Sequence, residues 1–274
     1  MLLERFRSAK RDEIASLRRA ADSGLLPAAY TGRRPDFISA LRSQRQVSCP
    51  SVVAEYKRAS PSLGVICETI EVEDVVRQYA ESGAAAISIL TEEKYFQGSL
   101  QYLERAARAR SVSNLSLPLL RKDFLFDPLQ VQMTASTPAS ALLLIVRLTP
   151  DVALLRQLRE KAESYGIQAV VEVFDANDLR LARESGARVI QVNARNLESL
   201  VVDRNACLAL AKKFPPQTGE TWIAASGIAH HQHLQKAADA GFHAVLVGSF
   251  LMKGGKPAKA LTDLMKCDSI FVGE

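Results

Sequence analysis

The feature that most restricts the fold of this chain is an alternation of short apolar runs with longer charged segments of helical period. From residue 50 onward there are eight apolar runs, at 52–56, 86–90, 117–120, 141–145, 169–173, 189–192, 222–224 and 244–247. Between and after them, apolar residues recur at helical spacing near 72–82, 98–110, 127–136, 150–165, 175–185, 203–213, 230–240 and 256–266. The runs are apolar throughout, which is typical of parallel strands buried on both faces.

Eight buried strands that alternate with helices predict a parallel (β/α)8 barrel, a TIM barrel. The alternative is an open doubly wound sheet, which is less favoured because no GxGxxG motif follows the first run and the chain has no P-loop. Residues 1–45 differ from the repeat and show amphipathic helices interrupted near Gly32 and Pro35. We therefore expect one barrel domain, residues 1–274, with 1–45 as an N-terminal helical extension.

Composition narrows the classes of partner. The 274 residues are 47% hydrophobic and 24% charged with a net charge of +5, which is ordinary for a globular protein with a sizeable core. Lys and Arg do not cluster with aromatic residues, so we expect no nucleic-acid partner. No apolar run approaches the roughly 18 residues that span a membrane, so we expect no membrane association.

The cellular compartment is predicted from the N-terminus and the cysteines. The first residues are charged and lack the apolar core of a signal peptide. The four cysteines, including Cys267, are far apart and form no CxxC pair, which fits reduced thiols. These features predict a cytoplasmic protein, and we expect a monomer or a weak homo-oligomer.

Ionisable and polar side chains lie at the ends of several predicted strands, where a barrel of this type has its active site. These side chains are Glu55, Lys57, Lys122, Glu172, Asn193 and Arg195. Each one alone is typical of a solvated or paired surface residue, but so many at one rim predict a functional site. Lys122 directly follows the apolar run 117–120, and a partly desolvated lysine can act as a proton donor near neutral pH.

Glycine and serine pairs follow the last two predicted strands, as Ser226-Gly227 and Gly248-Ser249. In these barrels the corresponding loops commonly bind phosphate through backbone N–H groups, and glycine permits close approach. The alternative is that both pairs are ordinary turns.

Two further features of the rim each have two interpretations. The Ser/Pro/Gly-rich loop at 58–66 is either a lid over the site or a passive connection. Phe96 and Phe124 are expected on rim loops, where they would pack against an aromatic substrate or fill the core. Arg121 and Asp123, on either side of Lys122, are interpreted as paired supports.

A histidine cluster, His230, His231 and His233, raises the possibility of a metal site, because positions i and i+3 share a helix face. No carboxylate or cysteine accompanies the cluster at ligand spacing. We therefore expect no bound metal there.

Several of these motifs resemble indole-3-glycerol phosphate synthases. The resemblance is carried by Val53-Ala-Glu55-Tyr-Lys57-Arg-Ala-Ser60-Pro-Ser-Leu-Gly64, Leu119-Leu-Arg-Lys122-Asp-Phe124, Val171-Glu172-Val173, Val192-Asn193-Ala-Arg195-Asn-Leu197 and Ser226-Gly-Ile228. It extends in order from about residue 50 to residue 260. The N-terminal helices are similar to the extra segment that precedes the barrel in that family.

The resemblance implies a phosphorylated small-molecule substrate, 1-(o-carboxyphenylamino)-1-deoxyribulose 5-phosphate, and closure of an indole ring with loss of carbon dioxide and then water. No cofactor and no metal are implied. The implied catalytic residues are Lys122 as the acid that protonates the ribulose carbonyl, Glu172, Lys57 and Glu55 in removal of the hydroxyl and proton, and Asn193 in orienting the substrate. The implied substrate-binding residues are Ser60, Phe96, Phe124, Arg195, Ser226, Gly227, Gly248 and Ser249.

The sequence departs from the family pattern at three places. The family usually has Glu before the Ser-Gly pair of the seventh strand, and here Ala225 occupies that position, so one member of the usual polar network is missing. The segments at 193–196 and 137–140 also differ, in ways that look structural. Ala225 motivates an alternative function, a related phosphosugar isomerase. A non-catalytic phosphosugar-binding barrel is a third possibility, against which the four retained ionisable residues argue.

Overall fold

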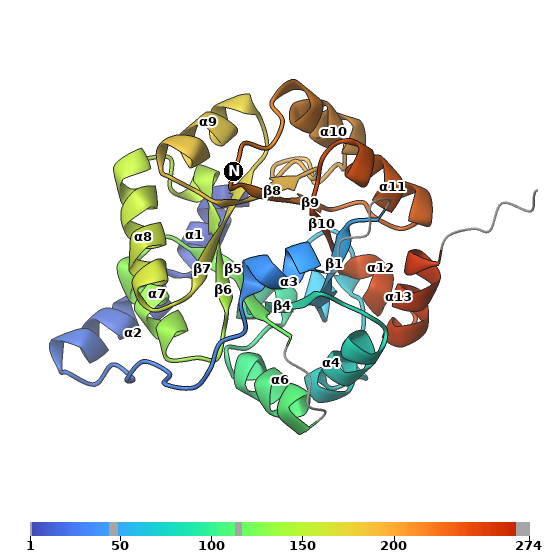
Figure 1. Ribbon diagram of the computed structural model, residues 1–274. Helices are drawn as coiled ribbons and strands as arrows, with labels where there is room; N and C mark the ends of the chain where they lie inside the picture. Colours follow the sequence, from blue (N-terminus) through green and yellow to red (C-terminus); the bar gives the residue numbers. More distant parts are fainter. Residues whose placement is uncertain (1, 44–48, 113–116, 267–274) are drawn as a thin grey trace, which may run out of the picture.

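The computed structural model describes residues 2–43, 49–112 and 117–266. Within these residues, eight parallel strands form a closed barrel surrounded by helices (Figure 1). The strands are β1 (Ser51–Tyr56), β4 (Ala86–Leu90), β5 (Leu119–Leu125), β6 (Ala141–Ile145), β7 (Gln168–Val173), β8 (Val189–Asn193), β9 (Thr221–Ala225) and β10 (Ala244–Val247). Pairing of β1 with both β10 and β4 closes the barrel, which confirms the predicted (β/α)8 architecture.

The eight predicted helices of the repeat are present. They are α4 (Val72–Glu81), α6 (Gln101–Val112), α7 (Pro128–Ala135), α8 (Val152–Ser164), α9 (Ala176–Glu184), α10 (Arg204–Lys213), α11 (His231–Asp239) and α13 (Pro257–Met265). Aspartate N-caps begin four of them, because their carboxylates accept hydrogen bonds from the unpaired backbone N–H groups of the first turn: Asp127, Asp151, Asp175 and Asp203. The short elements α5 (Glu93–Phe96), α12 (Ser249–Met252) and η1 (Val146–Leu148) were not predicted.

Two layers of apolar side chains hold the barrel together, because successive residues of a strand point to opposite faces. In β7, Val171 and Val173 belong to the layer between strands and helices. Val170 belongs to the layer inside the barrel. The same alternation turns Glu172 toward the interior, at the C-terminal end of its strand.

The N-terminal extension contacts both ends of the barrel. Its helix α3 (Phe37–Ser43) crosses one opening in Figure 1, and Phe37 and Leu41 are fully buried in the interior core. Helices α1 (Leu2–Ala9) and α2 (Arg11–Asp22) lie at the other end, where Phe6 stacks on Phe124 of β5. The prediction of helices in this segment is confirmed, and the segment also contributes to the interior core. Residues 1, 44 and 45 of the predicted extension, like Cys267, lie outside the described residues.

Strand β5 corrects one prediction. The sequence placed the strand end at Leu120, with Lys122 and Phe124 beyond it, but β5 continues through Leu125. The charges inside the strand are tolerated because they are paired: Arg121 Nη2 lies 3.0 Å from Asp123 Oδ2, and Lys10 Nζ lies 2.6 Å from Asp123 Oδ1. Interpretation of Arg121 and Asp123 as paired supports is confirmed. Over the described residues, no helix has the length and apolar character to cross a membrane.

Candidate active site

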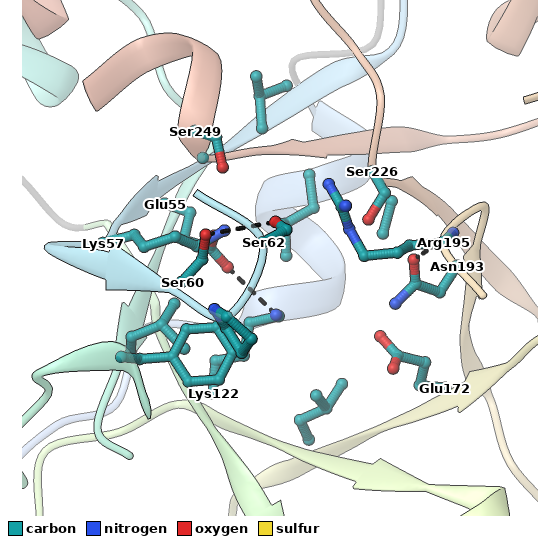
Figure 2. Close-up of a pocket in the computed structure, with 18 of the residues that line it drawn as sticks. Glu55, Lys57, Ser60, Ser62, Lys122, Glu172, Asn193, Arg195, Ser226 and Ser249 are labelled. Carbon is teal, nitrogen blue, oxygen red and sulfur yellow. Dashed lines mark hydrogen bonds and ion pairs between the residues drawn. The ribbon is translucent and has the colours of Figure 1, made fainter. Parts of the chain in front are cut away.

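A cavity of about 280 Å³ opens at the C-terminal ends of the barrel strands. Figure 2 shows that its side chains come from opposite sides of the barrel and converge on one space. The cavity is lined by every residue that the sequence nominated: Glu55, Lys57, Ser60, Phe96, Lys122, Phe124, Glu172, Asn193, Arg195, Ser226, Gly227, Gly248 and Ser249. The barrel therefore brings together residues that lie up to 194 positions apart in the chain.

Glu55 forms the electrostatic centre of the cavity. Its carboxylate is fully buried and lies between two ammonium groups, with Lys57 Nζ 2.5 Å from Oε1 and Lys122 Nζ 3.4 Å from Oε2. Burial opposes the charge of Glu55, but Lys122 and Lys57 outweigh it, and the pKa of Glu55 is lowered. Gly248 packs against this carboxylate so closely that a Cβ there would lie 2.1 Å from Oε1. Glycine is therefore required at that position.

The pKa values of the two lysines beside Glu55 are shifted in opposite directions. For Lys122, burial disfavours the charge, but the carboxylates of Glu55 and Glu172 more than compensate, and its pKa is raised. For Lys57, burial and the nearby charges of Lys122 and Arg195 prevail over Glu55, and its pKa is lowered. Lys122 therefore carries a proton at neutral pH and can donate it, whereas Lys57 releases its proton more readily.

Glu172 lies across the cavity from this cluster, at the end of β7, and is 2% exposed. Burial raises its pKa, although Lys122 and hydrogen bonds from the side chains of Asn193 and Gln191 favour the carboxylate. The Asn193 amide is oriented by its own Oδ1, which accepts a hydrogen bond of 2.9 Å from the backbone N–H of Arg195. A carboxyl group with a raised pKa takes up a proton more readily than an ordinary glutamate and can release it again.

The turn after β9 forms another side of the cavity. Ser226 has a φ of +73° and Gly227 one of +77°, so two consecutive residues adopt left-handed conformations. That conformation is strained for a serine, and such strain persists where the surroundings hold it. A Cβ at Gly227 would lie 2.6 Å from Val202 Cγ1, so glycine is needed for the turn to pack. Arg204 Nη1 donates a 3.1 Å hydrogen bond to Gly227 O and fixes the turn further.

An aromatic wall closes the cavity on the side of β5. Phe124 lies in the strand itself and Phe96 in α5, not on loops as predicted, with ring centroids 6.1 Å apart. Phe6 of α1 stacks on Phe124 at 4.0 Å and also lines the cavity. Phe124 thus both packs against other aromatic rings and faces the cavity. The sequence did not single out Phe6, because helical periodicity shows its apolar face without showing what that face meets.

The segment at 58–66 covers part of the opening. It folds as two short antiparallel strands, β2 (Ala59–Ser60) and β3 (Gly64–Val65). Ser60 and Ser62 line the cavity, with their hydroxyl oxygens 3.5 Å apart, and Figure 2 shows both beside the buried charges. Leu63, at the tip, is 59% exposed. Movement of this segment as a lid stays a prediction.

Ala225 belongs to the apolar side of the cavity. It is 3% exposed and packs in the interior core cluster that also contains Leu246 and Ile145. The charged residues that line the cavity are three cations and four carboxylates: Lys57, Lys122 and Arg195 with Glu55, Glu92, Asp123 and Glu172. Glu92 and Asp123 are bound elsewhere, by backbone N–H groups of α5 and by Lys10 and Arg121, so the cations of the cavity can meet negative groups of a ligand.

The histidine cluster has a local structural role. His233 Nδ1 accepts a 3.2 Å hydrogen bond from the backbone N–H of Ala229, and its ring contacts that of His230 edge to face. Over the described parts of the chain, no group of three or more His, Cys, Asp or Glu side chains could hold a metal ion.

Comparisons with known proteins agree with this geometry. The sequence profile of indole-3-glycerol phosphate synthase matches residues 3–264. An indole-3-glycerol phosphate synthase of Koribacter versatilis is 38% identical over 229 residues, which are 84% of this chain and 85% of that protein. One of Desulfotalea psychrophila is 35% identical over 97% of this chain and 98% of its own length.

Solved structures support the fold alone. A 3-hexulose-6-phosphate synthase from Salmonella typhimurium superimposes with a TM-score of 0.60 at 14% identity, over 78% of this chain and 98% of that one. Its sequence similarity is too low to indicate an activity. The profile match over nearly the whole chain and the similarity to the curated relatives show the family: the chain belongs to the indole-3-glycerol phosphate synthase family.

Proposed function

We propose that this cavity closes the indole ring of 1-(o-carboxyphenylamino)-1-deoxyribulose 5-phosphate by general acid–base catalysis, with Lys122 as the first proton donor. The family acts as carboxy-lyases in tryptophan biosynthesis on a phosphorylated small molecule. The observation that carries the assignment of roles is the buried group of Glu55, Lys57 and Lys122, with Glu172 facing it across the same cavity.

In the first step the aryl carbon that bears the carboxylate attacks the ribulose carbonyl carbon. The carbonyl oxygen gains negative charge and takes a proton, becoming a hydroxyl group. Lys122 is suited to supply this proton because Glu55 and Glu172 keep it protonated and Glu55 holds its position. The electrons of the aryl–carboxylate bond then return to the ring as carbon dioxide leaves.

In the second step the new hydroxyl group departs with a proton as water, and a proton is lost from the neighbouring carbon, which completes the indole. Glu172 is suited to this exchange because burial raises its pKa toward neutrality. Lys57, whose pKa is lowered, is the second candidate for a proton acceptor. Glu55 has a lowered pKa and serves as the counter-ion that positions both lysines.

The remaining cavity residues account for substrate binding. The turns at Ser226-Gly227 and Gly248-Ser249 suit the phosphate, because glycine allows an anion to approach the backbone closely. Arg195 and Lys57 suit the carboxylate that is lost, and Asn193 suits a carboxylate or hydroxyl group. Phe96 and Phe124 form a wall for the aryl ring, and Ser60 lies where the 58–66 segment meets the cavity.

The assignment is tested by incubating the purified chain with the aminodeoxyribulose phosphate and following indole fluorescence. The natural chain is expected to form product, and Lys122→Ala to lose at least about 100-fold in kcat because a general acid contributes roughly that factor. Lys212→Ala, on the exposed face of α10, is the matched control and is expected to keep full activity. A Lys122→Ala variant that folds and retains full turnover would refute the role of Lys122.

The phosphosugar isomerase and the non-catalytic barrel are not favoured by the comparisons. We propose in addition that the chain is one domain that works as a monomer or a weak homo-oligomer in the cytoplasm. Its family belongs to a biosynthetic pathway of phosphorylated small molecules, which supports that compartment. Light scattering during gel filtration and cell fractionation would test these points.

A further inference from the structure

Glu172 has a neighbour inside the barrel that the catalytic scheme does not use. Gln191 of β8 is in register with Glu172 of β7, so the two side chains point to the same interior face. Gln191 is fully buried, and its Nε2 donates a hydrogen bond of 2.5 Å to Glu172 Oε2. A buried amide this close to a reactive carboxyl group can control the geometry of that group.

The other end of the same amide is unusual. Gln191 Oε1 is buried and accepts no hydrogen bond from the described residues. A buried acceptor without a donor lowers stability, so its presence calls for an explanation. No hydrogen bond from the described residues to Oε1 opposes an exchange of the oxygen and nitrogen positions of this amide.

Asn193, the other amide beside Glu172, lacks this freedom. Its Oδ1 is engaged by the backbone N–H of Arg195, so its nitrogen alone is directed to Glu172. Asn193 can therefore donate a hydrogen bond to Glu172 but cannot accept one from it. Gln191 can donate Nε2–H to the carboxylate, and after a half-turn of its amide it can accept a hydrogen bond from the protonated acid through Oε1.

We propose that Gln191 is a positioning residue for the reaction, which holds Glu172 in place in both its ionised and its protonated states. The inference rests on the proposed function, in which Glu172 gains and loses a proton within one turnover. Without Gln191, Glu172 Oε2 would lose the hydrogen bond that Nε2 donates. The carboxyl group would then turn away or change its proton affinity.

The charges that face Glu172 determine the sign of the expected effect. Lys122 of β5 favours the carboxylate, Glu55 of β1 disfavours it, and Ile145, its register partner on β6, is apolar. Gln191 and Asn193 of β8 both donate to the carboxylate. Removing the Gln191 donor removes a contact that favours the ionised form, so the pKa of Glu172 rises.

The test compares the pH dependence of kcat for the natural chain with three variants. Gln191→Met keeps the side-chain length but removes donor and acceptor. We expect its kcat to fall about tenfold with little change in KM. In the plot of kcat against pH, the limb that reflects the ionisation of Glu172 should move up by about one pH unit. Gln191→Glu, when protonated, again offers a donor and an acceptor, so its activity is expected to recover at the acid end and to decline as it ionises beside Glu172.

Gln168→Met is the matched control. Gln168 lies at the opposite end of β7, where its amide contacts the N-terminal extension at Phe37 and Asp36. This variant is expected to lower stability without moving either limb of the pH profile. If Gln191→Met behaves in the same way, with no shifted limb and no change in kcat beyond that of the control, Gln191 is merely structural and the inference is overturned.

A second measurement does not depend on turnover. Without the donor, the folded-state pKa of Glu172 rises further above its unfolded value, so the unfolding free energy of Gln191→Met should decline more steeply with rising pH than that of the natural chain. In a Glu172→Gln background the two slopes should coincide. Equal slopes in the natural background would contradict the inference. If the natural chain forms no product, the proposed function is refuted. The comparison of the two pH slopes would still decide whether Gln191 acts on Glu172.

Discussion

At the end of β1, one buried carboxylate controls the protonation of its neighbours. Glu55 keeps Lys122 charged at neutral pH, and the two lysines in turn keep Glu55 ionised despite complete burial. A buried charge of this kind is tolerated only where partners of the opposite sign are held at short range. Gly248 is part of that arrangement, since only a residue without a Cβ leaves room for Glu55 Oε1.

Gly248→Ala is therefore expected to displace the Glu55 carboxylate and with it both lysines. We expect kcat/KM to fall about 100-fold, since a displacement of about 1 Å at a catalytic group can have that effect. Steady-state kinetics measures the change. Lys212→Ala is again the control, because its side chain lies on the exposed face of α10, away from the cavity. Equal activity of the two variants would show that Glu55 does not need the space at Gly248.

At the scale of elements, the N-terminal helices and β5 form one unit. Lys10, at the junction of α1 and α2, is 4% exposed and binds Asp123 of β5 at 2.6 Å and Glu13 at 2.7 Å. Burial opposes its charge, but Asp123 and Glu13 prevail and raise its pKa. Four residues before it, Phe6 stacks on Phe124. The extension thereby holds the strand that carries Lys122 through Asp123 and Phe124.

Lys10→Met should release this contact and leave Asp123 with fewer partners. We expect a loss of about 3 kcal/mol in unfolding free energy, the usual cost of breaking a buried ion pair, together with a higher KM as the aromatic wall loosens. Urea unfolding and steady-state kinetics test the two effects. For the control, Lys212→Met on the exposed face of α10, a change below about 0.5 kcal/mol is expected. A similar small change in Lys10→Met would rule out this role for the extension.

At the scale of the whole molecule, buried carboxylates make stability depend on pH. Burial opposes the charge of Asp123, but Arg121 and Lys10 outweigh it and lower its pKa from the ordinary 3.8 to about 2. A group whose pKa is lower in the folded state contributes stability above its unfolded pKa and loses it as the pH falls through the folded value. The barrel should therefore weaken between about pH 4 and pH 2. Glu55, whose pKa is also lowered, acts in the same direction.

Asp123→Asn should remove the part of this acid dependence that Asp123 causes. Because a shift of that size corresponds to about 2 kcal/mol, the variant should be less stable than the natural chain at pH 7 and should lose less stability on acidification. Urea unfolding from pH 7 to pH 2 measures both. Parallel pH curves for the two proteins would show that the ionisation of Asp123 is not linked to folding.

Much of the site could be predicted from the sequence because barrel topology is simple. Strand ends are visible as charges after apolar runs, and a parallel barrel places all such ends on one rim. Glu55, Lys122 and Glu172 could thus be assigned to one cavity although they are far apart in the chain. Gln191 was missed, although a signal existed: it lies two residues before Asn193 in an apolar run and therefore on the same face.

The sequence by itself determined the alternation of strands and helices, the barrel that follows from it and the residues at its rim, because these depend on hydrophobic period and local order along the chain. Only the tertiary structure decided how far β5 extends, that Phe6 enters the cavity, and which of two neighbouring lysines has its pKa raised. Each of these depends on partners such as Lys10, Asp123 and Glu55, brought together from distant segments. Burial and charge act through space, and their sum at one atom is set only once the chain has folded.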